Sequence, residues 1–258
     1  MVSRAVVLGS CGGWPEAGRA CSGFVVEHDG SRVVLDLGYG TAPRLFTLLG
    51  SSTGDGVDGV VVTHAHPDHV VDVHALFRAR WFGSRGAPRV PLYAPSGVVA
   101  MLAALEGGDE HLLDEVFDVH HLPQGRGDPH RVGPFLLKTW ALPHHVPAVG
   151  VRLDAPGLVV AYTGDTGPDP ALAELGRDAD LFIVDATDRY QRSGVAAADV
   201  ELDLTAAQAG AAAAAAGARR LLLTHFWPGN DRRASATAAA TAFVGPVLVA
   251  DEGLEITL

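Results

Sequence analysis

Lysine is almost absent from this chain of 258 residues, because Lys138 is the single lysine among 19 basic residues. This scarcity excludes a P-loop, whose Gly-Lys-Ser/Thr motif binds nucleotide phosphates, and it excludes an enzyme that forms a Schiff base through a buried lysine. Lys138 lies in the alternating segment from Phe135 to Trp140, a pattern typical of a strand with its lysine facing outward.

Cysteines and long apolar runs are also scarce. Cys11 and Cys21 form neither a Cys-x-x-Cys nor a zinc-knuckle pattern, so we expect both to be reduced and partly buried. No apolar run approaches about 18 residues, which excludes a membrane-spanning helix. The N-terminal segment lacks the apolar core and cleavage site of a signal peptide. A cytoplasmic location is therefore expected.

Positive charge is in deficit, since 19 Lys and Arg against 30 Asp and Glu give a formal net charge of −11. Tight binding to long nucleic acids depends on Lys and Arg that neutralise phosphates, so such a partner is not expected. A chain of this length buries roughly 70 to 75% of its unfolded surface, which is enough for a stable core without disulfides. No linker or repeat interrupts the chain, and we expect residues 1–258 to form one domain.

Short apolar runs separated by Gly, Pro and Asp alternate with helical patterns, which predicts an α/β fold. The expected strands are residues 5–8, 23–27, 33–36, 59–63, 90–93, 135–142, 149–153, 158–163, 181–184, 220–224, 246–250 and 254–258. The expected helices are residues 69–81, 96–105, 109–119, 170–176, 205–216 and 231–243. Thr205 is expected to cap the alanine-rich helix, and Gly217 to end it.

Histidine, by contrast, occurs 12 times, and four ligand-type side chains crowd into the segment His-Ala-His-Pro-Asp-His at residues 64–69. Residues two apart on an extended backbone point the same way, so His64 and His66 can converge on one ion. The proline then favours a helix start that turns Asp68 and His69 toward a neighbouring point. This density of imidazole and carboxylate predicts a metal site.

Three further expected strands end in ligand-type residues. His144 and His145 follow the strand at 135–142, Asp165 lies between two glycines after another, and His225 follows a third. Because α/β folds keep their sites at the carboxyl ends of strands, these side chains are candidates to complete the site.

With these motifs the sequence resembles the metallo-β-lactamase superfamily, in particular its ribonuclease Z and cyclic-nucleotide phosphodiesterase-like branch. Besides residues 64–69, the resemblance rests on an opening Gly-rich turn, an Asp-x-Gly-x-Gly-Thr segment, a Gly-Asp-Thr segment and a final Thr-His. These lie at residues 8–13, 35–41, 163–166 and 223–228. Together they extend over nearly the whole chain.

The resemblance implies a four-layer αββα sandwich with a dinuclear metal site at one edge. It implies that one ion takes His64, His66 and His144, that the other takes Asp68, His69 and His225, and that Asp165 bridges them. His144 is preferred to His145 because in similar proteins this histidine lies six residues before a glycine, here Gly150. Asp36 is expected to accept a hydrogen bond from a ligand imidazole. Zn²⁺ suits such donors, as do Mn²⁺ and Fe²⁺.

The activity implied is hydrolysis of a small phosphodiester, such as a cyclic nucleotide, by a hydroxide that bridges the ions, with Asp68 and His145 as candidate proton donors. The alternatives are a ribonuclease Z-like tRNA 3′-processing endonuclease, a lactonase or thioesterase, and a non-catalytic binding protein that the metal stabilises. Similar tRNA-processing members carry a long basic arm and histidines where this chain has Val184 and Asp203. These departures disfavour tRNA cleavage. A homodimer is left open.

Overall fold

The computed structural model describes residues 3–123, 127–187 and 202–258, and its contacts divide the chain into two compact units. Unit 1 comprises Met1–Pro123 with Asp251–Thr257, and unit 2 comprises Gln124–Ala250. Each unit contains one seven-stranded sheet. The mixed α/β class expected from the sequence is confirmed, whereas the single domain over residues 1–258 stays a prediction.

Unit 1 has the strand order β14-β1-β2-β3-β4-β5-β6, in which pairing is antiparallel from β14 to β3 and parallel from β3 to β6. Its strands are β1 (Arg4–Gly9), β2 (Gly23–His28), β3 (Ser31–Leu37), β4 (Gly59–Val61), β5 (Val90–Pro95), β6 (Phe117–Leu122) and β14 (Glu255–Thr257). Its helices are α1 (Thr41–Leu49), α2 (Pro67–Gly83), α3 (Val98–Ala104) and the 3₁₀ helix η1 (Glu110–Glu115).

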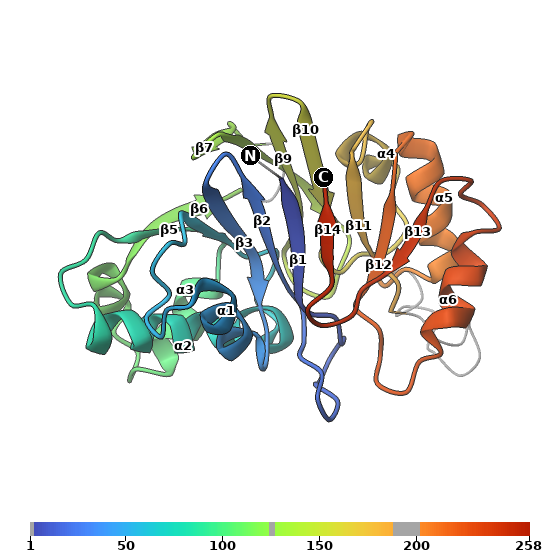
Figure 1. Cartoon of the computed structure of the whole chain (residues 1–258). Coiled ribbons are helices and arrows are strands. Elements are labelled where there is room, and N and C mark those ends of the chain that lie inside the picture. Colours follow the sequence, from blue (N-terminus) through green and yellow to red (C-terminus); the bar gives the residue numbers. More distant parts are fainter. Residues whose placement is uncertain (1–2, 124–126, 188–201) are drawn as a thin grey trace. The chain divides into compact units, whose positions relative to one another are not determined.

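The helices of unit 1 pack along one side of its strands (Figure 1). Leu45 of α1, Phe77 of α2 and Leu102 of α3 are buried against strand residues such as Val34 and Leu92. This packing gives α2 a fixed support, and the N-terminal turn of α2 carries two of the candidate ligands.

Unit 2 repeats the same pattern, with the order β13-β12-β11-β10-β9-β8-β7, antiparallel from β7 to β10 and parallel from β10 to β13. Its strands are β7 (His130–Val132), β8 (Phe135–Leu142), β9 (Ala148–Ala155), β10 (Leu158–Tyr162), β11 (Leu181–Asp185), β12 (Leu221–Thr224) and β13 (Val247–Val249). Its helices are α4 (Ala171–Leu175), α5 (Ala206–Ala216) and α6 (Arg232–Ala239).

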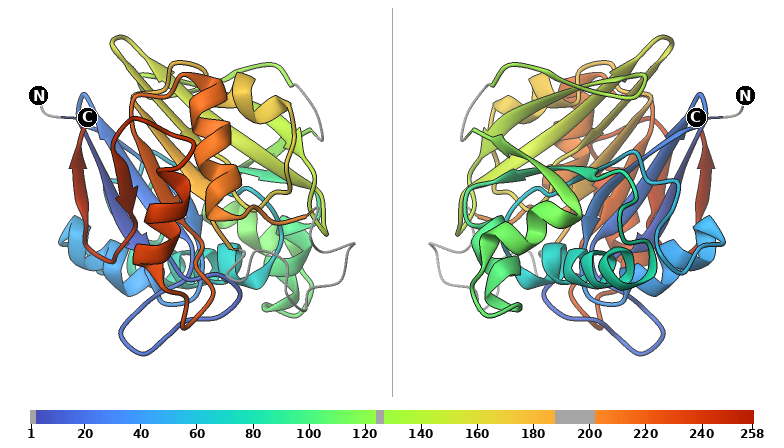
Figure 2. Two further views of the ribbon diagram at one scale, coloured as in Figure 1. Left: turned by 90° about the vertical axis from the view of Figure 1, so that its right-hand side faces the viewer. Right: turned by 90° about the vertical axis from the view of Figure 1, so that its left-hand side faces the viewer.

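Helices α5 and α6, orange in Figure 2, lie over the strands of unit 2. The caps expected for α5 are confirmed: the Thr205 hydroxyl accepts the N–H of Gln208, the Gln208 side chain accepts the N–H of Thr205, and Gly217 has the left-handed conformation. The helix packs so closely on α6 that a Cβ at Gly210 would lie 2.3 Å from the carbonyl oxygen of Ala239. Small residues are therefore required at this crossing.

Three elements differ from the sequence-based expectation. The prediction of one helix over residues 109–119 is wrong, because the 3₁₀ helix ends at Glu115 and strand β6 begins at Phe117. This segment forms a strand because it pairs in parallel with β5. Its polar residues obscure the alternation of apolar and polar side chains by which a strand is predicted from sequence. Helix α1 was not expected, since Gly40 precedes it without a capping side chain, and the three-residue β7 was also missed. Among the described residues, no helix is both long and apolar enough to cross a membrane.

Candidate metal centre

In unit 1 the chain brings four ligand-type residues together where β4 leads into α2. His66 occupies the N-cap of α2 in an extended conformation, and the proline after it begins the helix. Asp68 and His69 lie in the first turn and are buried, with residue exposures of 6% and 0%. A carboxylate in the first turn is favoured by the helix dipole.

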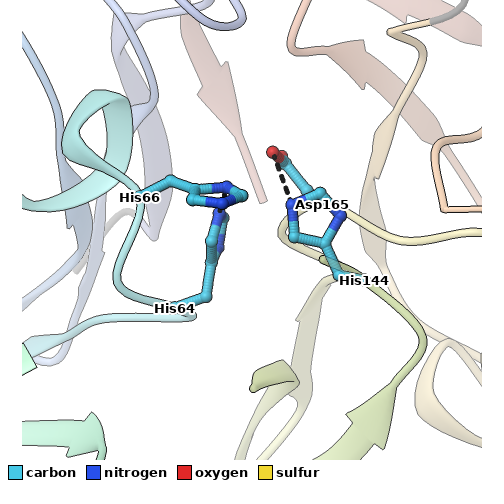
Figure 3. Close-up of side chains that lie close together, drawn as sticks. All are labelled: His64, His66, His144 and Asp165. Atoms are coloured by element: carbon cyan, nitrogen blue, oxygen red, sulfur yellow. Dashed lines mark hydrogen bonds and ion pairs between the residues drawn. The ribbon is translucent and has the colours of Figure 1, made fainter. Parts of the chain in front are cut away.

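The donor atoms of these residues approach one another closely. His64 Nε2 lies 3.1 Å from His66 Nδ1, and Figure 3 shows the two rings together. His69 Nε2 lies 3.6 Å from Asp68 Oδ2. Two imidazole lone pairs can face one another at such a distance when a cation accepts both, so this spacing suits a shared ion.

Asp36 lies behind these ligands, fully buried and with a left-handed backbone (φ 57°). Its carboxylate accepts the N–H of Thr63 at 2.8 Å and the Thr63 hydroxyl at 2.9 Å. It also accepts His69 Nδ1–H at 2.8 Å. The Thr63 oxygen lies 3.0 Å from His64 Nδ1. Asp36 therefore orients His69 directly and His64 through Thr63. His69 Nε2 then faces Asp68 and His64 Nε2 faces His66, as donors to a metal would.

The Gly-rich segment before β2 supports Asp68. The Gly13 N–H donates to Asp68 Oδ2 at 2.7 Å, which holds the carboxylate in place. Burial, together with the negative charge of Asp68, raises the pKa of the Cys21 thiol well above its ordinary value. Cys11 and Cys21 are both reduced and fully buried.

Unit 2 carries the remaining candidate ligands at three strand ends: His144 after β8, Asp165 after β10 and His225 after β12. Asp165 Oδ2 lies 3.7 Å from His144 Nε2, drawn as the dashed line in Figure 3, and 3.2 Å from His225 Nε2. His144 Nδ1 donates to the carbonyl of Leu202 at 2.9 Å. Each of these rings therefore turns Nε2 toward the Asp165 carboxylate.

His144 and His145 occupy different positions. The His144 side chain is only 3% exposed and faces Asp165, whereas His145 is exposed, with its ring edge-on to His144 at 5.1 Å between centroids. Asp203, where similar tRNA-processing members have histidine, places Oδ1 3.9 Å from His144 Nδ1. His144 therefore faces Asp165, whereas His145 is exposed, and the assignment of His144 as the ligand stays a prediction.

One contact of a candidate ligand was missed from the sequence. The Thr187 hydroxyl lies 2.5 Å from His225 Nδ1 and also donates to Asp185. A local pattern could have pointed to Thr187. Asp185 ends an apolar strand, and the side chain of such an aspartate often accepts the backbone N–H two residues later, here that of Thr187.

The donor set fits divalent metal ions. The seven ligand-type side chains are all histidines and aspartates, residue types that can hold a metal ion. They are His64, His66, Asp68, His69, His144, Asp165 and His225. Imidazole with carboxylate is the combination that Zn²⁺, Mn²⁺ and Fe²⁺ accept.

The chain belongs to the β-lactamase superfamily, because the family described as "Beta-lactamase superfamily domain" matches residues 31–226, about three quarters of its length. The two sheets with their helices match the metallo-β-lactamase fold. The crystal structure of the metallo-β-lactamase fold protein YhfI from Bacillus subtilis covers 100% of both chains with a TM-score of 0.85 and 24% identity.

Two relatives are similar in sequence. The uncharacterized protein Rv1339 of Mycobacterium tuberculosis is 32% identical over 204 residues, which are 76% of this chain and 72% of the relative. Ribonuclease Z of Kineococcus radiotolerans is 30% identical over 288 residues, which cover 93% of this chain and 89% of the relative. The superfamily therefore identifies a metallo-hydrolase and leaves its substrate open.

Proposed function

We propose that this protein is a phosphodiesterase that depends on two divalent ions and hydrolyses a small phosphodiester such as a cyclic nucleotide. In this proposal one ion is held by His64, His66 and His144, the other by Asp68, His69 and His225, and Asp165 is shared. The ions would be Zn²⁺, with Mn²⁺ or Fe²⁺ as alternatives.

The observation that carries this proposal is the orientation of the ligand imidazoles. Four of them, His64, His69, His144 and His225, have Nδ1 in a hydrogen bond with another group of the protein. Such contacts determine which ring nitrogen remains available and lower the cost of ordering the ligand on binding. A histidine that merely stabilises a core would not need Nε2 turned toward a carboxylate.

Two divalent ions would supply Lewis acidity and activate water near neutral pH. The protein itself would hold Asp68 in place through the Gly13 N–H. His145, exposed beside His144, is the proposed source of the proton that the leaving oxygen requires, and Asp68 is the other candidate.

A small substrate is supported by charge and by the connections of unit 2. The net charge of −11 opposes a long polyanion. Within residues 127–187 there is no long arm, and β9 and β10 are joined by only Pro156 and Gly157. Val184 is fully buried in β11, so it offers no polar group where tRNA-processing members have histidine.

Exposed indoles support a substrate with a flat ring. Trp14, 51% exposed, follows the glycine that holds Asp68, and Trp227, 43% exposed, lies two residues after His225. An exposed indole offers a stacking surface for a nucleobase.

The experiment is a substrate comparison on Zn²⁺- and Mn²⁺-loaded protein with cyclic AMP, bis(p-nitrophenyl) phosphate, a precursor tRNA, a homoserine lactone and a glutathione thioester. We expect the diesters to turn over fastest and Asp165→Asn to abolish turnover. The matched control is Asp178→Asn, since Asp178 is exposed and asparagine tolerates its left-handed backbone (φ 53°).

Ribonuclease Z activity is the second candidate, favoured by the Kineococcus relative, and fastest cleavage of precursor tRNA would establish it instead. Fastest turnover of the lactone or thioester would also overturn the proposal. Metal binding without turnover of any substrate would identify a non-catalytic, metal-stabilised protein.

A further inference from the structure

Asp185 is a fully buried carboxylate at the end of β11 that is not among the proposed ligands. It accepts backbone N–H groups from Thr187 at 2.8 Å, Leu204 at 3.1 Å and Thr166 at 3.4 Å. It also accepts the Thr187 hydroxyl. These donors stabilise a buried charge and fix the carboxylate where it lies.

The position of the hydroxyl proton follows from counting donors. A carboxylate can only accept, so the single proton of the Thr187 hydroxyl is directed to Asp185. The same oxygen lies 2.5 Å from His225 Nδ1, and it must therefore accept a proton from that nitrogen. His225 then carries its proton on Nδ1, and the unprotonated Nε2 lies 3.2 Å from Asp165 Oδ2.

We propose that Thr187, anchored by Asp185, is a positioning residue that sets the protonated nitrogen and the direction of the His225 ring for metal binding. This inference rests on the proposed function, in which His225 is a ligand. Asp185 Oδ1 itself lies 3.7 Å from His225 Nδ1, beyond hydrogen-bond distance, so the hydrogen bond to the imidazole comes from Thr187, which Asp185 orients. In water the proton of a neutral imidazole exchanges between the two ring nitrogens. Without the Thr187 hydroxyl, part of the population would carry the proton on Nε2, which could then not bind a metal ion.

The backbone at His225 is consistent with such a role. His225 has a φ of 58°, one of four non-glycine residues with positive φ in the described part of the chain. A left-handed histidine is strained and persists only where its surroundings hold it. The hydrogen bond to Thr187 is one of the contacts that hold this ring.

A similar chain of contacts in unit 1 supports the assignment. Asp36 accepts the Thr63 hydroxyl, whose oxygen lies 3.0 Å from His64 Nδ1. Asp36 also binds His69 directly, so a change at Thr63 would disturb two ligands at once. Thr187 contacts one ligand and therefore gives the clearer test.

The experiment compares Thr187→Val, Thr187→Ser and Thr224→Val in the full chain. Valine replaces the hydroxyl by a methyl group of similar size, whereas serine keeps the hydroxyl. Thr224 is the matched control, because it is fully buried next to His225 and its hydroxyl has no hydrogen-bond partner among the residues that the structure describes. Zn²⁺ affinity is measured by competition with a chromophoric chelator, and the ring nitrogens of His225 by ¹⁵N NMR before and after Zn²⁺ is added.

We expect Thr187→Val to weaken binding of the second Zn²⁺ by about 10- to 100-fold. Before Zn²⁺ is added, it should also weaken the preference for the Nδ1–H form, because the Asp185 carboxylate, 3.7 Å away, then still faces Nδ1. Thr187→Ser and Thr224→Val should match the parent chain in both measurements. The proposal is overturned if Thr187→Val keeps the Nδ1–H form and the parent affinity.

A loss of affinity in Thr187→Val that serine does not restore would also overturn the proposal, since it would indicate a fold defect. Neither measurement depends on turnover. A parent chain that hydrolyses no diester would therefore refute the proposed function and leave the positioning role to be judged by affinity and NMR.

Discussion

Gly38 shows how closely the chain approaches a ligand in unit 1. A Cβ at this position would lie 1.8 Å from the carbonyl oxygen of Asp68 and 2.9 Å from Cys21 Cβ. Because the obstacle is the backbone at the start of α2, it cannot move without displacing Asp68. Gly38→Ala should therefore weaken Zn²⁺ binding by about 10-fold or more, measured by isothermal titration.

The control for this change is Gly30→Ala, where a Cβ meets nothing within 4 Å and only the left-handed backbone (φ 81°) is strained. That strain costs about 1 to 2 kcal/mol of stability and should leave metal affinity unchanged. Equal affinities for the two variants would show that the close approach at Gly38 does not matter to the site.

The two cysteines lead to a chemical prediction at the same scale. Burial and the neighbouring Asp68 raise the pKa of Cys21 well above its ordinary value, so hardly any thiolate forms at pH 8. Cys11 is equally inaccessible. A disulfide reagent such as Ellman's reagent should therefore detect no thiol in the folded protein and two after denaturation. Rapid labelling of either cysteine in the folded protein would contradict this.

At the scale of elements, the crossing of α5 and α6 makes Gly210 an exception to helix propensity. In an exposed helix interior, Gly→Ala stabilises by about 1 kcal/mol. At Gly210 the new Cβ would meet the Ala239 carbonyl at 2.3 Å, and overpacking of this kind costs about 1 to 3 kcal/mol. Gly210→Ala should therefore lower the free energy of unfolding by up to about 2 kcal/mol, measured with urea.

Ala214→Gly serves as the comparison, because Ala214 is exposed on the same helix. Its effect should follow helix propensity alone, so that the free energy of unfolding falls by about 1 kcal/mol. A gain of stability in Gly210→Ala would mean that the two helices separate easily at this point.

Elements with strong local signals could be predicted from the sequence, and elements that depend on tertiary pairing could not. Helix α5 has a hydroxyl N-cap, a run of alanines and a terminal glycine, all local features. Strand β6 contains Asp118, His120 and His121, so its identity as a strand comes from pairing with β5. Helix α1 follows Gly40 without a polar cap and gains its stability from packing and from Asp72, whose carboxylate accepts the Ala42 N–H at 2.8 Å.

The same distinction applies to the candidate site. The ligand-type residues follow apolar strands, and the approach of His64 to His66 could be inferred from two-residue periodicity. The contact of Thr187 with His225 joins positions 38 residues apart, and no spacing rule connects them. The surroundings of the ligands are set by the fold and not by the motif.

At the scale of the whole molecule, the two units repeat one topology, with three antiparallel pairings followed by three parallel ones in each sheet. In both units an aspartate lies at or just after the strand where the direction changes: Asp36 is the second-last residue of β3, and Asp165 follows β10 by three residues. In unit 1 the proposed ligands follow the neighbouring strand β4, and in unit 2 they follow β8, β10 and β12. A duplicated arrangement of this kind offers each unit's ligands on rigid strand ends, where small displacements are costly.

Removal of metal tests the proposal that ligands from both units bind the same ions. A ligand present at 100 times its dissociation constant stabilises the folded state by about 2.7 kcal/mol, which for a chain of this size is about 5 to 10 °C in Tm. We therefore expect EDTA to lower the Tm followed by circular dichroism, and added Zn²⁺ to restore it in the parent and in Asp178→Asn. Asp165→Asn should lose most of this shift, because Asp165 is the ligand that the proposal assigns to both ions. An unchanged Tm on metal removal would mean that the folded chain does not bind the ions.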